Sequence, residues 1–281
     1  MKKFEQGCFE GERALYDIHD ALIIDSTFQN GESPLKECSN LEIKHSFFKW
    51  KYPLWYSHDI TCENVTLLET ARSGIWYTNN IKMINCNISA PKTFRRGDGI
   101  TLINCSLPNA LETMWNCKNI TLKKVTATGD YFGFNAEGVD IEDFQLIGNY
   151  AFDGGKNIVI KHAKLDSKDS FWNCENVTVY DSIIVGEYLG WNSKNITFIN
   201  CTIDSHQGMC YMDNVKLVNC RLLNTDLCFE LCSNIDAEIV TIIDSVKNPI
   251  SGKIVAKGIK ELIMDEKYID PSKTEIIVKD E

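Results

Sequence analysis

The sequence has no long apolar stretch. Nowhere do its 281 residues approach the roughly 18 consecutive apolar residues of a membrane-spanning helix. The opening residues, MKKFEQGCFEGERAL, carry two lysines with no apolar segment behind them, so we expect no signal peptide. We therefore expect a cytoplasmic protein without a membrane partner.

Basic residues are also in short supply. The chain has 29 Lys and Arg against 39 Asp and Glu, which gives a formal net charge of −10. Binding to a phosphate backbone requires a basic surface. The composition therefore argues against nucleic acid as a partner.

Motifs for metals, cofactors and nucleophilic catalysis are absent. Twelve cysteines are too few for a disulfide scaffold of this length, and none forms a CxxC pair, so we expect reduced thiols. The five histidines never cluster at ligand spacing, and no P-loop, GxGxxG or GxSxG sequence occurs. We predict neither a metal site nor a cofactor.

What the sequence does contain is a repeat. Residues 171–184 read FWNCENVTVYDSII, and residues 190–203 read GWNSKNITFINCTI. The Asn of the EN and KN pairs marks one position that recurs every 19, 20 or 21 residues and is always Asn, Asp or Gly. These residues tolerate left-handed backbone and turns. The twelve markers are Asp20, Asn40, Asp59, Asn80, Gly99, Asn119, Gly138, Asn157, Asn176, Asn195, Asn214 and Asn234.

Each repeat predicts two short strands. The positions one and three residues after the marker are apolar with polar residues between them, and a second apolar pair follows after a bend. A leucine-rich repeat is excluded because both halves of the repeat read as strand. We predict an all-β, single-stranded right-handed parallel β-helix of about twelve coils. The coils occupy residues 19–242 of one domain, with caps at 1–18 and 243–281.

Four cysteines fall in one interior column of this repeat, six residues after the marker. They are Cys86, Cys105, Cys201 and Cys220. Small buried hydrophobic residues are the expected occupants of such a column, so we interpret these cysteines as core residues rather than metal ligands.

An aromatic column lies four residues before the marker. Its members include Trp55, Trp76, Arg95, Trp115, Phe134, Asp153, Trp172 and Trp191. The preceding column is apolar or Gly throughout and should point inward, so the aromatic column should point outward. Two residues further back lies a column of mostly small residues that should form an outward floor, and beyond it a polar row that contains Lys51 and Arg72. Aromatic faces and polar groups suit the faces and hydroxyl edges of sugar rings.

The column admits a second interpretation. Stacked aromatic residues also stabilise a sheet surface, and a terminal segment or partner chain can cover them. Arg95 and Arg96, in PKTFRRGDG, add the same ambiguity, because arginine recognises carboxylates but also stacks on tryptophan. Residues 44–96 hold eight Lys or Arg and three Asp or Glu, a local positive excess that would suit an anionic oligosaccharide. The predicted ligand-binding residues are Trp55, Trp76, Trp115, Phe134, Trp172, Trp191, Lys51, Arg72 and Arg96.

The stretches GESPLKE, KWKYPLWYS, GIWYT and GEYLGWNSKN resemble a bacterial family of right-handed parallel β-helix proteins that is filed as a domain of unknown function and is close in shape to pectin lyases. The resemblance covers the whole chain and implies the fold. It implies no catalytic residues. Polysaccharide enzymes on this fold use paired Asp on adjacent coils, or calcium-binding Asp with Arg or Lys bases, and neither pattern is matched here.

Two functions remain open. The first is a carbohydrate-active lyase or glycoside hydrolase that uses Glu112, Asp130 and Asp153 near Arg95 as its acids and bases. Strict alternation would turn Glu112 inward, which weakens that assignment. The second is a non-catalytic scaffold or protein-binding β-solenoid whose aromatic column docks a glycan or a protein.

Overall fold

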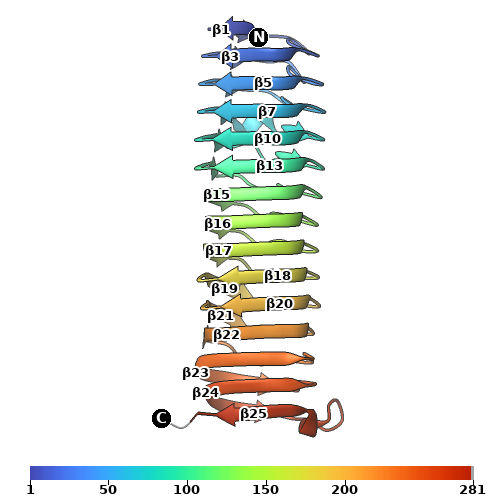
Figure 1. Ribbon diagram of the computed structural model, residues 1–281, viewed down its shortest axis with the longest axis vertical. Coiled ribbons are helices and arrows are strands. Elements are labelled where there is room, and N and C mark those ends of the chain that lie inside the picture. Colours follow the sequence, from blue (N-terminus) through green and yellow to red (C-terminus); the bar gives the residue numbers. More distant parts are fainter. Residues whose placement is uncertain (280–281) are drawn as a thin grey trace. The chain divides into compact units, whose positions relative to one another are not determined.

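The computed structural model describes residues 1–279. They form an all-β parallel β-solenoid of about 15 turns (Figure 1). The only helical segments among these residues are two short 3-10 turns, Glu69–Ala71 and Pro271–Lys273, and none is long and apolar enough to span a membrane. The chain divides into two compact units, residues 1–145 and residues 146–281.

In the first unit each strand pairs in parallel with its copy one coil along the chain (Figure 1). After the four-residue strand of the first coil, each coil contributes a six-residue strand and a two-residue strand, until the two merge into one long strand; two of these coils add a further two-residue strand. The elements are β1 (Lys2–Glu5), β2 (Cys8–Phe9), β3 (His19–Ile24), β4 (Thr27–Phe28), β5 (Ser39–Lys44), β6 (Phe47–Phe48), β7 (His58–Glu63), β8 (Thr66–Leu67), β9 (Ile75–Trp76), β10 (Asn79–Ile84), β11 (Asn87–Ile88), β12 (Phe94–Arg95), β13 (Asp98–Ile103), β14 (Ser106–Leu107), β15 (Lys118–Thr128) and β16 (Glu137–Ile147), whose last two residues belong to the second unit.

The second unit continues the same pattern of parallel pairing between consecutive coils. Its elements are β17 (Lys156–Asp166), β18 (Glu175–Tyr180), β19 (Ile183–Glu187), β20 (Lys194–Ile199), β21 (Thr202–His206), β22 (Asp213–Leu223), β23 (Ile235–Lys247), β24 (Gly252–Ile263) and β25 (Thr274–Val278).

The markers are the corners of the coils. All twelve have a left-handed backbone, with φ between 51° and 73°. A side chain with a Cβ is strained there, and Asn, Asp and Gly are strained least. The Asn side chains also join consecutive corners, since Asn80 Nδ2 donates to Asp59 Oδ1 at 3.1 Å. This explains why the repeat keeps these three residue types.

The predicted inward columns form the core. Ile23, Ile43, Met83 and Leu102 occupy one of them and are fully buried. In another, Phe28 and Phe48 stack with their ring centres 4.6 Å apart and their planes at 5°. Burial of such a side chain contributes about 1.5–3 kcal/mol. Repeated in each coil, this burial offsets the entropy lost by ordering the chain.

The terminal segments contain more coils than predicted. β1 and β2 pair with β3 and β4, so residues 2–9 form a further coil although Met1 stands at the marker position. Ile235 pairs with Gly252, and Gly252 pairs with Thr274. The first of these two coils is shorter than the repeat of 19 to 21 residues, and the second is longer. The count of twelve was therefore too low. Residues 280 and 281, the end of the predicted C-terminal cap, lie outside the described residues.

Candidate functional site

The aromatic column of the first unit faces outward, as predicted. The residues before it, including Leu54, Ile75 and Phe94, are fully buried. The tryptophans themselves are half-buried, because each ring is covered by its neighbours in the column. We call Trp55, Trp76, Arg95, Trp115 and Phe134 the ridge.

The ring faces of the ridge are turned toward one another. Trp55 and Trp76 stack with ring centres 5.3 Å apart and planes at 8°. Arg95 continues the stack, with its guanidinium carbon 4.6 Å from the Trp76 ring centre and 4.5 Å from that of Trp115. Phe134 follows Trp115 at 5.0 Å. Because these faces are occupied, the ridge offers ring edges rather than stacking platforms to a ligand.

The indole N–H groups are satisfied within the protein. Trp76 Nε1 donates to the carbonyl of Lys92 at 2.8 Å, and Trp115 Nε1 donates to the carbonyl of Tyr131 at 2.7 Å. Each bond fixes a ring against the next coil. The ridge is therefore a preorganised wall.

Arg95 is held by a carboxylate as well as by the two rings. Its Nη2 donates to Glu112 Oε2 at 3.2 Å, and Lys92 Nζ lies 3.1 Å from the same oxygen. The Glu112 side chain is 25% exposed and points outward, contrary to the expectation from strict alternation. Its φ of 50° breaks that alternation, since a left-handed residue redirects the chain.

A second row of rings lies one residue beyond the ridge. Tyr56 and Tyr77 stack with ring centres 4.8 Å apart and parallel planes. Arg96 lies over the Tyr77 ring at 5.8 Å and donates to its hydroxyl at 3.1 Å. Lys36 lies over the Tyr56 ring at 5.5 Å. Cations therefore flank this row at both ends.

Beside the ridge lies a concavity of about 320 Å³. Its lining residues are Trp50, Lys51, Glu69, Thr70, Arg72 and Pro91. Lys51 Nζ is 5.3 Å from the Trp50 ring centre and 3.2 Å from Glu32 Oε1. Arg72 is exposed, and no carboxylate of residues 1–279 forms an ion pair with it. The concavity therefore combines the Trp50 ring, with Lys51 over it, the carboxylate of Glu69, and an arginine that forms no ion pair within residues 1–279.

The predicted floor between the ridge and the polar row is not exposed. Pro53, Gly74, Thr93 and Thr113 are all buried. These residues lie outside the strands, where side chains do not alternate as they do in a strand. The polar row and the ridge are therefore separated by buried residues rather than by an exposed floor.

The second unit has a shorter stack of the same kind. Trp172 and Trp191 lie 5.8 Å apart, and Tyr211 covers Trp191 at 4.6 Å. Beyond them Glu230 is buried, with Lys247 Nζ 2.8 Å from its carboxylate and Gln207 Nε2 donating at 2.7 Å. The bond to Glu230 raises the pKa of Lys247. This ion pair ends the aromatic stack.

The structure brings only some of the predicted catalytic residues together. Arg95 and Glu112 meet as an ion pair. Asp130 is one coil further on, and its carbonyl accepts from the Glu112 N–H at 2.9 Å. Asp153 belongs to the second unit, where its carboxylate accepts from Asn173 at 2.9 Å. Within residues 1–279 no three His, Cys, Asp or Glu side chains are grouped as metal ligands.

The sequence places the chain in a known family. The sequence model of "Protein of unknown function (DUF3737)" matches residues 2–277. The chain belongs to this family. No curated protein matches it.

Several solved structures share part of its architecture. A surface adhesin of Streptococcus pneumoniae, PfbA, is 13% identical, with 85% of this chain and 72% of that chain covered and a TM-score of 0.34. The A-module of the mannuronan C-5 epimerase AlgE4 of Azotobacter vinelandii is 10% identical, with 99% and 88% covered and a TM-score of 0.27. The fluoroquinolone resistance protein QnrB1 is 14% identical, with 79% and 94% covered and a TM-score of 0.25. Likenesses of this size carry no argument about function.

Sequence reasoning missed Trp50. It is the one tryptophan outside the aromatic column, and it directly precedes Lys51 of the polar row. The structure places it in the concavity with Lys51 and Arg72. Its position outside the column was the available signal, because a tryptophan that the repeat does not require needs another reason to be there.

Proposed function

We propose that the first unit binds an anionic carbohydrate chain without transforming it, at the concavity beside the ridge. The observation that carries this proposal is the grouping of Trp50, Lys51 and Arg72 around one cavity of about 320 Å³. That volume is at the lower end of the range for small-molecule sites, about 300–1,000 Å³. The two lining cations, Lys51 and Arg72, outnumber the one lining carboxylate, Glu69, and together with the Trp50 ring they match a sugar that carries a carboxylate.

Charge supports an anionic ligand. Arg72 has no carboxylate partner among residues 1–279, so a ligand carboxylate would not have to displace one. Lys92, Arg95 and Arg96 extend the cationic groups along the ridge side of the same unit. Arginine binds carboxylates through two parallel N–H groups, which gives orientation as well as affinity.

The stacking platform would be Trp50 rather than the ridge. The faces of Trp55, Trp76 and Trp115 are occupied by each other or by Arg95. No aromatic ring stacks on Trp50 among the described residues. A sugar ring that lies on Trp50 leaves the ridge stack closed, and it shares the indole with Lys51, whose Nζ lies 5.3 Å from the ring centre.

Binding fits the geometry better than catalysis. Glu112 is the counter-ion of Arg95 and Lys92, and Asp153 belongs to the other unit. The predicted acids and bases are therefore not gathered around one reacting bond. The lyase or hydrolase alternative is retained as an outcome of the test, because it predicts new reducing ends or unsaturated products.

The test is calorimetric titration with oligouronates and with neutral oligosaccharides of equal length. We expect saturable binding of the uronates alone, weakened about 10- to 100-fold by Arg72→Ala, since a hydrogen bond to a charged group contributes about 1.5–3 kcal/mol. Lys82→Ala is the matched control, because Lys82 is an exposed cation of β10 outside the concavity. Equal binding of neutral sugars, or equal losses in both variants, would refute the proposal. Product formation would favour the enzyme.

A further inference from the structure

The first coil leaves part of the core uncovered. Four core columns begin in this coil with residues that are partly exposed, namely Phe4, Phe9, Leu15 and Ile18. The residues that follow them in the same columns are at most 1% exposed, namely Ile23, Phe28, Leu35 and Cys38. The end of a repeat array needs a polar outer face for solubility. The first coil instead presents these four apolar side chains.

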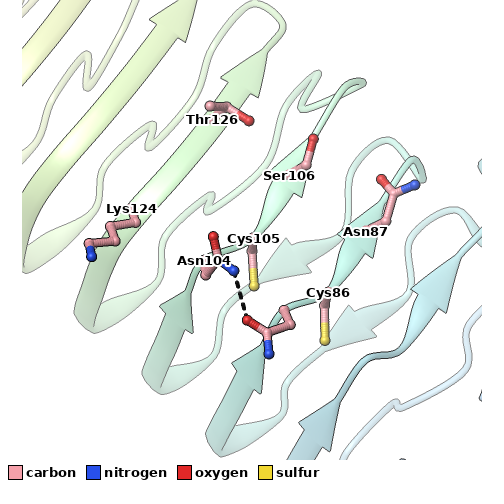
Figure 2. A pocket seen from close by; sticks show the side chains of 8 residues that line it. Cys86, Asn87, Asn104, Cys105, Ser106, Lys124 and Thr126 are labelled. Carbon is pink, nitrogen blue, oxygen red and sulfur yellow. Dashed lines mark hydrogen bonds between the residues drawn. The ribbon is translucent and has the colours of Figure 1, made fainter. Parts of the chain in front are cut away.

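A missing neighbour explains this exposure. Inside the first unit, each core side chain has a coil on both sides. Figure 2 shows this for Cys86 and Cys105, which point the same way from neighbouring coils and are each 3% exposed. The first coil pairs with the second and, within residues 1–279, with no coil on its other side. A partner on this open face would bury Phe4 and the other three side chains as the rest of the core is buried.

The strand β1 also has a free edge. It pairs with β3, and with no other strand of the described chain. The N–H of Gln6 donates to the Ile24 carbonyl at 3.0 Å, so the backbone of Gln6 faces the second coil. Alternate residues of a strand direct their N–H and C=O groups to opposite edges. The backbone groups of Lys3 and Glu5 therefore face away from the second coil, where they are a template for another chain.

We propose that a second copy of this chain docks on the first coil, with the two β1 strands antiparallel. The two-fold axis passes through Phe4, so that Lys3 of each copy lies opposite Glu5 of the other. Both residues have free backbone groups on this edge, and each Lys3–Glu5 pair exchanges two hydrogen bonds. The two Phe4 residues form the pair between them that exchanges none, with Cα atoms about 4.5 Å apart.

The side chains of β1 match in the same register. Lys3 Nζ lies 2.7 Å from Glu5 Oε2 of its own strand, and both side chains are half exposed. In the dimer each of them also meets the opposite charge of the second copy, because opposite charges across antiparallel strands attract each other. On the other face of the strand, the two Phe4 rings meet at the axis and close their core column.

Head-to-tail stacking fits less well. If β25 of another copy lay on β1 in the register of the other coils, Glu275 would lie opposite Lys3, but Ile277 would lie opposite Glu5. Only one charge would then be matched, and further copies would add without limit. The two-fold arrangement matches both charges and closes after two copies. Neither arrangement uses the residues of the proposed carbohydrate site.

Sedimentation velocity of the full chain over a range of concentrations tests the proposal. We expect a monomer–dimer equilibrium in the native protein. Lys3→Glu and Glu5→Lys each place like charges opposite one another, so each should raise the dissociation constant by about 10-fold or more. An equal mixture of the two variants should dimerise again, because every pair across the interface then joins a lysine to a glutamate.

Lys82→Glu is the control, since Lys82 is an exposed cation of β10 in the interior of the first unit, and it should dimerise like the native protein. A monomeric native protein, or a dimer that neither variant weakens, would overturn the proposal. Long polymers that are lost in Lys3→Glu but retained in Glu5→Lys would identify head-to-tail stacking instead. Two variants that stay monomeric when mixed would contradict the antiparallel register.

Discussion

The guanidinium carbon of Arg95 lies 4.5 Å from the ring centre of Trp115. The same group lies against Trp76 on its other side and donates to Glu112. A cation that replaces one aromatic ring in a stack keeps the stack continuous, because the faces of both rings attract it. The local role of Arg95 is therefore to hold the ridge together.

We predict that Arg95→Ala lowers the free energy of unfolding by about 1–3 kcal/mol, because it removes two cation–π contacts and one ion pair. Denaturant unfolding measures this value. Arg96→Ala is the control, since Arg96 is exposed and contacts only one ring, that of Tyr77, at 5.8 Å, so its loss should cost less. Equal losses in the two variants would contradict a structural role for the sandwich.

The corner residues give a second prediction. Asn119 has a φ of 51°, and Gly99 and Gly138 stand at the same corner of the neighbouring coils. Asn119→Ala should cost about 1–2 kcal/mol, because alanine is strained in the left-handed region and cannot hydrogen-bond there. Asn119→Gly should cost less. Thermal unfolding of Asn119→Ala and Asn119→Gly measures the two losses of stability. An alanine variant as stable as the glycine variant would argue against the left-handed corner.

The thiols give a third prediction. Burial raises the pKa of Cys62 to about 12 and likewise that of Cys117 to about 12. A thiol-specific disulfide reagent at pH 8 should therefore react quickly with the exposed Cys8 alone and slowly with the buried cysteines. In denaturant all twelve should react at once. Several fast thiols in the folded protein would show that the predicted core columns are open.

The same pKa values fix the sign of a pH effect. In the unfolded chain these thiols ionise near the ordinary value of 9.0, whereas in the folded chain they remain protonated to about pH 12. Stability is therefore fully present below pH 9 and is lost as the pH rises from 9 toward 12. Denaturant midpoints measured across this window should fall. A Cys117→Ser variant should lose less stability over the same pH range, because it lacks one of these buried thiols.

Most of the architecture followed from the repeat. The markers identify the left-handed corners, and the apolar columns identify the buried positions, because both requirements recur in every coil. The additional coils were missed since Gly252 and Thr274 break the spacing and Met1 is no corner residue by type. A period defined on regular coils cannot detect irregular ones.

The site was harder to predict because it depends on turns. Period-two alternation applies to strands, and it failed at Thr93 and Glu112, which lie between strands. The outward direction of the tryptophan column was predictable from its buried neighbours. The occupation of the ring faces was not, since the sequence does not specify ring orientation. Trp50 and Arg72 are brought together only by the fold.

The central claim is that an anionic sugar binds at Trp50, and tryptophan fluorescence tests it most directly. An oligouronate is titrated into the native protein, Trp50→Phe and Trp191→Phe, the last of which lies in the second unit. We predict a saturable change in emission in the native protein and in Trp191→Phe, and its loss in Trp50→Phe. An unchanged response in Trp50→Phe, or no response in any of the three proteins, would contradict the account.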